Sequence, residues 1–64
     1  MWHPEKHEAE RAEKLILTGK LSPQEKKSMS AIIHAHKTQQ TRDWLDRAVL
    51  MALEEKYKGQ LAEL

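Results

Sequence analysis

This 64-residue sequence contains a nearly continuous apolar stretch toward its C-terminal end, and this stretch limits the folds that the chain can adopt. Eight of the ten residues from Trp44 to Leu53 are apolar, and in a helix they would cover almost the whole circumference. A helix that is apolar all round needs partners all round. A chain of this length buries only about 60% of the surface that its unfolded form exposes. We therefore expect part of this helix to be shielded by a second copy or by another protein.

Composition narrows the class of protein. The absence of cysteine excludes disulfides and cysteine-ligated zinc, and it fits a reducing compartment. The longest unbroken apolar run, Ala48 to Leu53, is far shorter than the roughly 20 residues that a membrane-spanning helix needs. The segment from Met1 to Glu8 is charged where a signal peptide would be apolar. These features predict a cytoplasmic protein.

Helix-capping signals predict an all-α fold of three short helices in a single domain covering residues 1–64. The first helix is expected over about 4–18, because Pro4 suits a first turn and Gly19 suits a left-handed residue just past the end. The second is expected over about 23–37, because Ser22-Pro23-Gln24-Glu25 combines a serine N-cap, a proline at the first position and a glutamate that completes a capping box.

The third helix is expected over about 41–62. Thr41 is the predicted N-cap, with Asp43 in the first turn, where the helix dipole favours an acid. The linker before Thr41 contains neither glycine nor proline, so one continuous helix over 23–62 is the alternative. The expected fold therefore has its second and third helices either separate or joined.

The third helix is also the predicted dimer interface, because two short helices cannot surround it. We expect a homodimer whose contact surface consists of Trp44, Leu45, Ala48, Val49, Met51, Ala52, Leu53 and Tyr57.

No sequence pattern for catalysis is present: there is no GxSxG, no phosphate-binding glycine loop and no HExxH. Acids such as Glu8, Glu10 and Glu13 are expected to lie on solvated helix faces. We accordingly predict a protein that is not an enzyme and has no cofactor or metal site. The favoured function is a small regulatory module that binds a larger, unidentified protein.

Three residues carry further hypotheses. His3, as the third residue, could join a free α-amine and two amides around Cu(II) or Ni(II) in a square plane. His36 falls on the apolar stripe of the second helix, which indicates a hydrogen-bonded core or interface residue. Trp2 is expected either to pack against the first helix or to stay exposed as a binding handle.

The charge pattern leaves nucleic-acid binding open. Residues 20–47 hold six Lys or Arg residues against three acids, whereas the segments on either side each sum to −1. The middle of the chain is thus mildly basic, which permits contact with DNA without requiring it.

Residues 14–53 resemble the ribbon-helix-helix family of DNA-binding repressors and antitoxins. The resemblance lies in Leu15–Leu21 as a short strand, Ser22–Glu25 opening one helix and Thr41–Val49 opening another. It implies an obligate dimer whose paired strands enter the major groove, with Thr18 and Lys20 reading bases. This is the alternative function, and the residues expected to contact nucleic acid in it are Thr18, Lys20, Lys26, Lys27 and Arg42.

Overall fold

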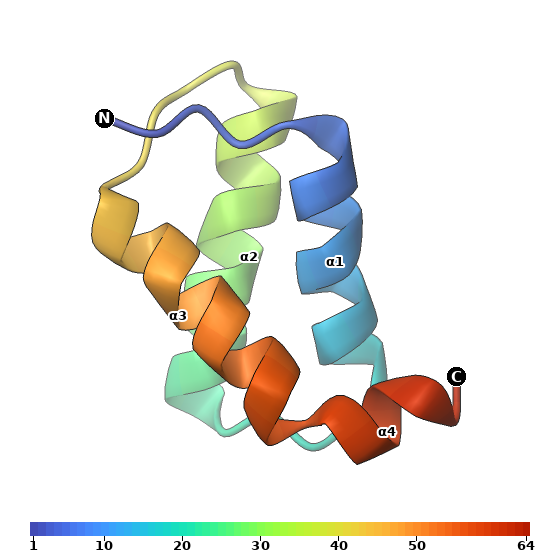
Figure 1. The fold of residues 1–64 in the computed structure, drawn as a ribbon. Coiled ribbons are helices and arrows are strands. Elements are labelled where there is room, and N and C mark those ends of the chain that lie inside the picture. The colour runs from blue at the N-terminus through green and yellow to red at the C-terminus, as the bar shows by residue number, and fades with distance from the viewer.

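The computed structural model describes residues 1–64 and contains no β-strand beyond one isolated bridge. Its four helices are α1 (Lys6–Leu17), α2 (Pro23–Lys37), α3 (Trp44–Lys56) and α4 (Lys58–Ala62). The α1 helix packs most extensively on α2, and α3 crosses in front of that pair (Figure 1). The all-α prediction is confirmed. None of these helices is both long enough and apolar enough to cross a bilayer.

The two predicted helix ends around residue 20 are confirmed. Gly19 has a φ of +71°, and its N–H donates to the carbonyl of Ile16 at 3.1 Å, which closes the end of α1. Ser22 and Glu25 form the predicted reciprocal capping box at the start of α2. Local chemistry alone therefore determines the turn from α1 into α2.

The start of α1 differs from the prediction, since the helix begins at Lys6 and Pro4 lies outside it. Pro4 is fully buried, and its carbonyl accepts a hydrogen bond from Nδ1 of His36 at 3.1 Å. Tertiary contact between the N-terminal segment, residues 1–5, and α2 thus displaces the first turn from the position that the sequence suggested.

The second and third helices are separate. The α2 helix ends with Gln39 in the left-handed region at a φ of +59°. The N–H of Gln40 donates to the carbonyl of Ala35 at 2.8 Å, and that of Gln39 donates to the carbonyl of His36 at 3.3 Å. These two bonds form a Schellman ending, which normally uses glycine at the left-handed position. A glutamine there explains why the sequence left this boundary open.

The third helix starts at Trp44 with Asp43 as its N-cap, so the predicted cap at Thr41 is wrong. The Asp43 carboxylate accepts from the N–H of Leu45 at 2.8 Å. The chain cannot be helical at Arg42, because Arg42 forms an antiparallel bridge with Trp2 through backbone bonds of 2.8 and 2.7 Å. This bridge ties the N-terminal segment to the link between α2 and α3.

The expected helix over 41–62 is interrupted at Tyr57, where φ is −108° and ψ is 25°. The short α4 that follows carries Leu61 back onto the core. Gly59 lies inside α4.

The core lies where α1, α2, α3 and the N-terminal segment meet. Its buried members are Trp2, Ala12, Leu15, Met29, Ile32, Leu50 and Leu53. Every helix except α4 contributes to this cluster, so each is held mainly by its apolar side rather than by intrinsic propensity.

The strand that a ribbon-helix-helix fold would require is absent. Residues 15–17 end α1, Gly19 turns the chain, and Thr18 caps the helix by donating from Oγ1 to the carbonyl of Leu15 at 2.6 Å. The prediction of a strand over residues 15–21 is therefore wrong.

The two left-handed helix ends give a matched prediction. Gly19→Ala should lower the free energy of unfolding by about 1 kcal/mol, because an L-residue is strained there. An added Cβ would have no heavy atom within 4 Å, so no steric clash contributes. Gln39→Gly should raise the free energy of unfolding by up to about 1 kcal/mol, since it relieves the same strain. Urea denaturation followed by circular dichroism measures both; effects of equal sign would contradict the assignment.

Candidate interaction surface

The α3 helix has an inner side, two flanks and an outer face. Leu50 and Leu53 point inward and are buried. The outer face, as we define it, consists of five exposed apolar residues: Trp44, Leu45, Ala48, Met51 and Ala52. Among these, Trp44 is 57% exposed, Leu45 68% and Met51 51%. Their spacing places them within roughly a third of the helix circumference.

The structure thus divides the eight residues of the predicted dimer interface. Five of them form the outer face. The other three, Val49, Leu53 and Tyr57, pack on the core of a single copy, Leu53 being buried and the other two half-buried. One copy therefore covers more of α3 than the sequence suggested.

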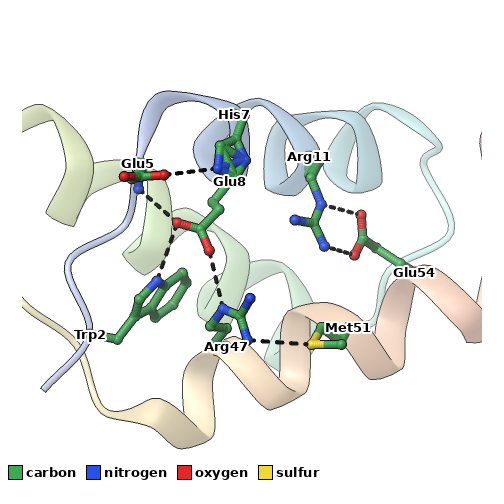
Figure 2. A network of polar contacts seen from close by, with 8 residues as sticks. All are labelled: Trp2, Glu5, His7, Glu8, Arg11, Arg47, Met51 and Glu54. Carbon is green, nitrogen blue, oxygen red and sulfur yellow. Dashed lines mark hydrogen bonds and ion pairs between the residues drawn. The ribbon is translucent and has the colours of Figure 1, made fainter.

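The flank toward α1 is held by two ion pairs. Arg11 donates two hydrogen bonds to the Glu54 carboxylate. Its Nε lies 2.7 Å from Oε2, and its Nη2 donates to Oε1. Arg47 donates from Nε to Oε2 of Glu8 at 3.2 Å and from Nη1 toward the sulfur of Met51 at 3.8 Å. Figure 2 shows both arginines lying between α1 and α3. Hydrogen bonding to Glu54 raises the pKa of Arg11, although burial opposes the shift.

The flank toward α2 is held by Glu25. Its carboxylate accepts from Nζ of Lys56 at 2.9 Å and from the hydroxyl of Tyr57 at 2.8 Å, while its Oε1 also accepts from the backbone N–H of Ser22. These hydrogen bonds lower the pKa of Glu25 to about 2. The bond from the Ser22 N–H has the largest effect, followed by those from Lys56 and Tyr57. The bond to Glu25 likewise raises the pKa of Lys56.

Glu8 is the one buried charged side chain, and its two oxygens join three segments (Figure 2). Oε1 accepts from the indole N–H of Trp2 at 3.2 Å and from the backbone N–H of Glu5 at 2.9 Å, while Oε2 accepts from Arg47. Burial alone raises the pKa of Glu8, but the bonds from Glu5, Arg47 and Trp2 outweigh burial and leave it below the ordinary value of 4.5.

An open pocket of about 460 Å³ lies beside this network. It is lined by Met1, Trp2, His3, Glu5, Glu8, Trp44 and Arg47. Trp44 lines the pocket and also belongs to the outer face, so the pocket and the face form one continuous surface.

The sequence left two alternatives for Trp2 and misplaced Glu8. Trp2 is 4% exposed, so it packs in the core and is not a free binding handle. Glu8, expected on a solvated face, is buried beneath it. Glu5 and Glu8 stand at the N-cap and third positions of α1, and this capping-box spacing was the signal that could have revealed Glu8.

The bonds around the histidines disfavour a bound metal ion. Ligand atoms of Glu5, His7 and Glu8 lie within 4.8 Å of one another. Both oxygens of Glu8 are already hydrogen-bonded, one of them to a guanidinium, which repels a cation. The amide of Trp2, which a square-planar site at His3 would use, donates to the carbonyl of Arg42 instead.

The residues of the alternative nucleic-acid reading are not gathered on one strand. Thr18 is turned back onto its own helix, and Arg42 pairs with Asp46 at 2.8 Å. Lys20, Lys26 and Lys27 are exposed around the turn into α2. These three lysines are exposed, but the ribbon that would present them to bases is absent.

The chain matches no protein-family model, and comparisons with curated proteins and with solved structures give no match.

The Glu25 contacts predict how stability depends on pH. The folded-state pKa of Glu25 lies below the ordinary value of 4.5, so its stabilising effect is full above about 4.5 and is lost as the pH falls to about 2. In urea denaturation, Glu25→Gln should be less stable than the wild type at pH 7. The two proteins should become alike near pH 2.

Glu13→Gln serves as the control, because Glu13 is exposed and makes no ion pair. It should follow the wild-type curve across the same pH range. A wild-type stability that stays flat between pH 4.5 and 2 would contradict the role of Glu25.

Proposed function

We propose that this protein is a small, non-enzymatic helical interaction module that forms a homodimer through the outer face of α3. As a dimer, it would bind a larger protein partner and act as a regulator. The proposal rests on one observation: Trp44, Leu45 and Met51 are each more than half exposed on one face of one helix. Contiguous apolar surface of this kind is typical of protein–protein contact sites.

The way α3 is held supports the proposal. Arg47 and Glu54 are bonded to α1, while Lys56 and Tyr57 are bonded to α2. Neither flank can rotate inward to hide the outer face without breaking these contacts. A face that is fixed before binding loses less conformational entropy on association than a mobile one.

The size of the face sets the expected affinity. Five residues from each copy are few compared with the roughly 20–30 per side in a standard interface. We expect a weak dimer, with a dissociation constant on the order of tens of micromolar. Such a dimer would form more completely when a larger partner binds both copies at once.

The surface for the larger partner is proposed to be the exposed lysine group of Lys20, Lys26 and Lys27. These residues lie around the turn into α2 and do not belong to the outer face. Three exposed like charges favour an acidic protein surface as the partner.

Leu45→Glu tests the dimer. Residue 45 is the second residue of α3, where a glutamate suits the helix dipole, so the fold should persist. Two carboxylates placed in an apolar contact should weaken association at least about tenfold. Sedimentation velocity from low micromolar to near-millimolar concentration should show the wild type approaching twice 7.5 kDa and the variant staying near 7.5 kDa.

Leu17→Glu is the matched control. Leu17 is 65% exposed, close to the 68% of Leu45, but it lies at the end of α1. This variant should dimerise like the wild type. A wild type that remains at 7.5 kDa throughout, or equal weakening by both substitutions, would disprove a dimer through the outer face.

A further inference from the structure

The residues along the outer side of α3 have the spacing of a short coiled-coil seam. Positions 44, 48, 51 and 55 are separated by four, three and four residues. This is the spacing of the a and d positions of a coiled coil. They are occupied by Trp44, Ala48, Met51 and Glu55, all of them exposed. The seam therefore alternates in size and ends in a charge.

We propose that a second copy packs antiparallel on this seam, so that Trp44 of each copy meets Glu55 of the other. This inference rests on the proposed homodimer and specifies its arrangement. The two-fold axis passes between the levels of Val49 and Leu50, which is the midpoint of the seam.

Side-chain size supports the antiparallel arrangement. It places Met51 of each copy over Ala48 of the other, so a large side chain fills the space above a small one. Leu45 likewise comes close to Ala52 of the second copy at one edge of the seam. The alanines let the two helix axes approach to about 8–10 Å, the normal packing distance.

Two polar groups without partners also support the antiparallel arrangement. The Trp44 indole N–H donates to no group within one copy, and the Glu55 carboxylate has neither an ion pair nor a hydrogen bond there. In the antiparallel dimer the two groups come to the same level, where the N–H can donate to the carboxylate. The two-fold symmetry produces this bond twice.

A parallel dimer fits the same residues poorly. It would place Glu55 against Glu55, which is a like-charge contact. It would also place Ala48 against Ala48 and Trp44 against Trp44, leaving a gap beside a crowded pair. The Trp44 and Glu55 levels would then be 11 residues apart, or about 16 Å, too far for a bond.

Thiol cross-linking determines the direction, because the chain has no cysteine of its own. Leu45→Cys and Ala52→Cys are treated with a short bis-maleimide, separately and mixed. The antiparallel dimer brings residues 45 and 52 of different copies together, whereas two residues 45 lie about nine residues apart along the axis, or about 13 Å. The mixture should therefore give a covalent heterodimer, distinguished by intact mass, and Leu45→Cys alone should give little product. Two residues 52 lie only about five residues apart along the axis, or about 8 Å, so Ala52→Cys alone can also be cross-linked.

The other outcomes separate the two proposals. A covalent homodimer from Leu45→Cys alone, in a yield equal to that of the mixture, would overturn the antiparallel arrangement while leaving the homodimer intact. A dimer by sedimentation without any cross-linked product would place the contact elsewhere. A monomer by sedimentation would remove the proposed homodimer itself.

Glu55→Ala gives a second, independent readout. In the antiparallel dimer it removes the acceptor for Trp44 and should weaken association about three- to tenfold. In a parallel dimer it would remove a repulsion and strengthen association. Glu13→Ala, on α1, is the control and should leave association unchanged; stronger association of Glu55→Ala would overturn the proposal.

Discussion

The buried carboxylate of Glu8 is the contact on which the arrangement of this small fold depends. A charge removed from water is tolerated only when hydrogen bonds and an opposite charge compensate for its lost solvation. Glu8 obtains these from the indole of Trp2, the backbone of Glu5 and the guanidinium of Arg47. One side chain thus fixes the N-terminal segment and α3 to α1 at once. With Arg47 held there, the rotation of α3 about its axis is set, and with it the identity of the residues left on the outer face.

The sequence was informative where a structure is decided by neighbouring residues. The Ser22–Glu25 capping box and the left-handed Gly19 were predicted correctly, because each satisfies backbone groups a few residues away. The end of α2 was left open because Gln39 adopts a conformation that glycine usually provides, and nothing in its local sequence marks it. Three residues further on, the tertiary bridge between Trp2 and Arg42 holds the link to α3.

In the candidate surface, too, some features follow from the local sequence and others depend on tertiary contacts. The sequence predicted a helix that is apolar almost all round, and five of the eight predicted interface residues are exposed in one copy. It could not tell which side faces inward, because the helix is apolar almost all round. That choice depends on partners 31 to 43 residues away in the chain, namely Glu8, Arg11 and Glu25, which bond to the flanks. A periodicity of one helix contains no information about such partners.

The bridge between Trp2 and Arg42 also has a consequence for the order of folding. The α1–α2 hairpin is built from local contacts and can form as soon as its residues leave the ribosome. Trp2 has no backbone partner until Arg42 has been synthesised, and its indole shares Glu8 with Arg47. During synthesis the N-terminal segment therefore lacks its backbone bonds to Arg42 while the hairpin forms. Trp2 and its neighbours therefore complete their native contacts late, and until then the chain lacks the backbone bonds that hold this tryptophan in place.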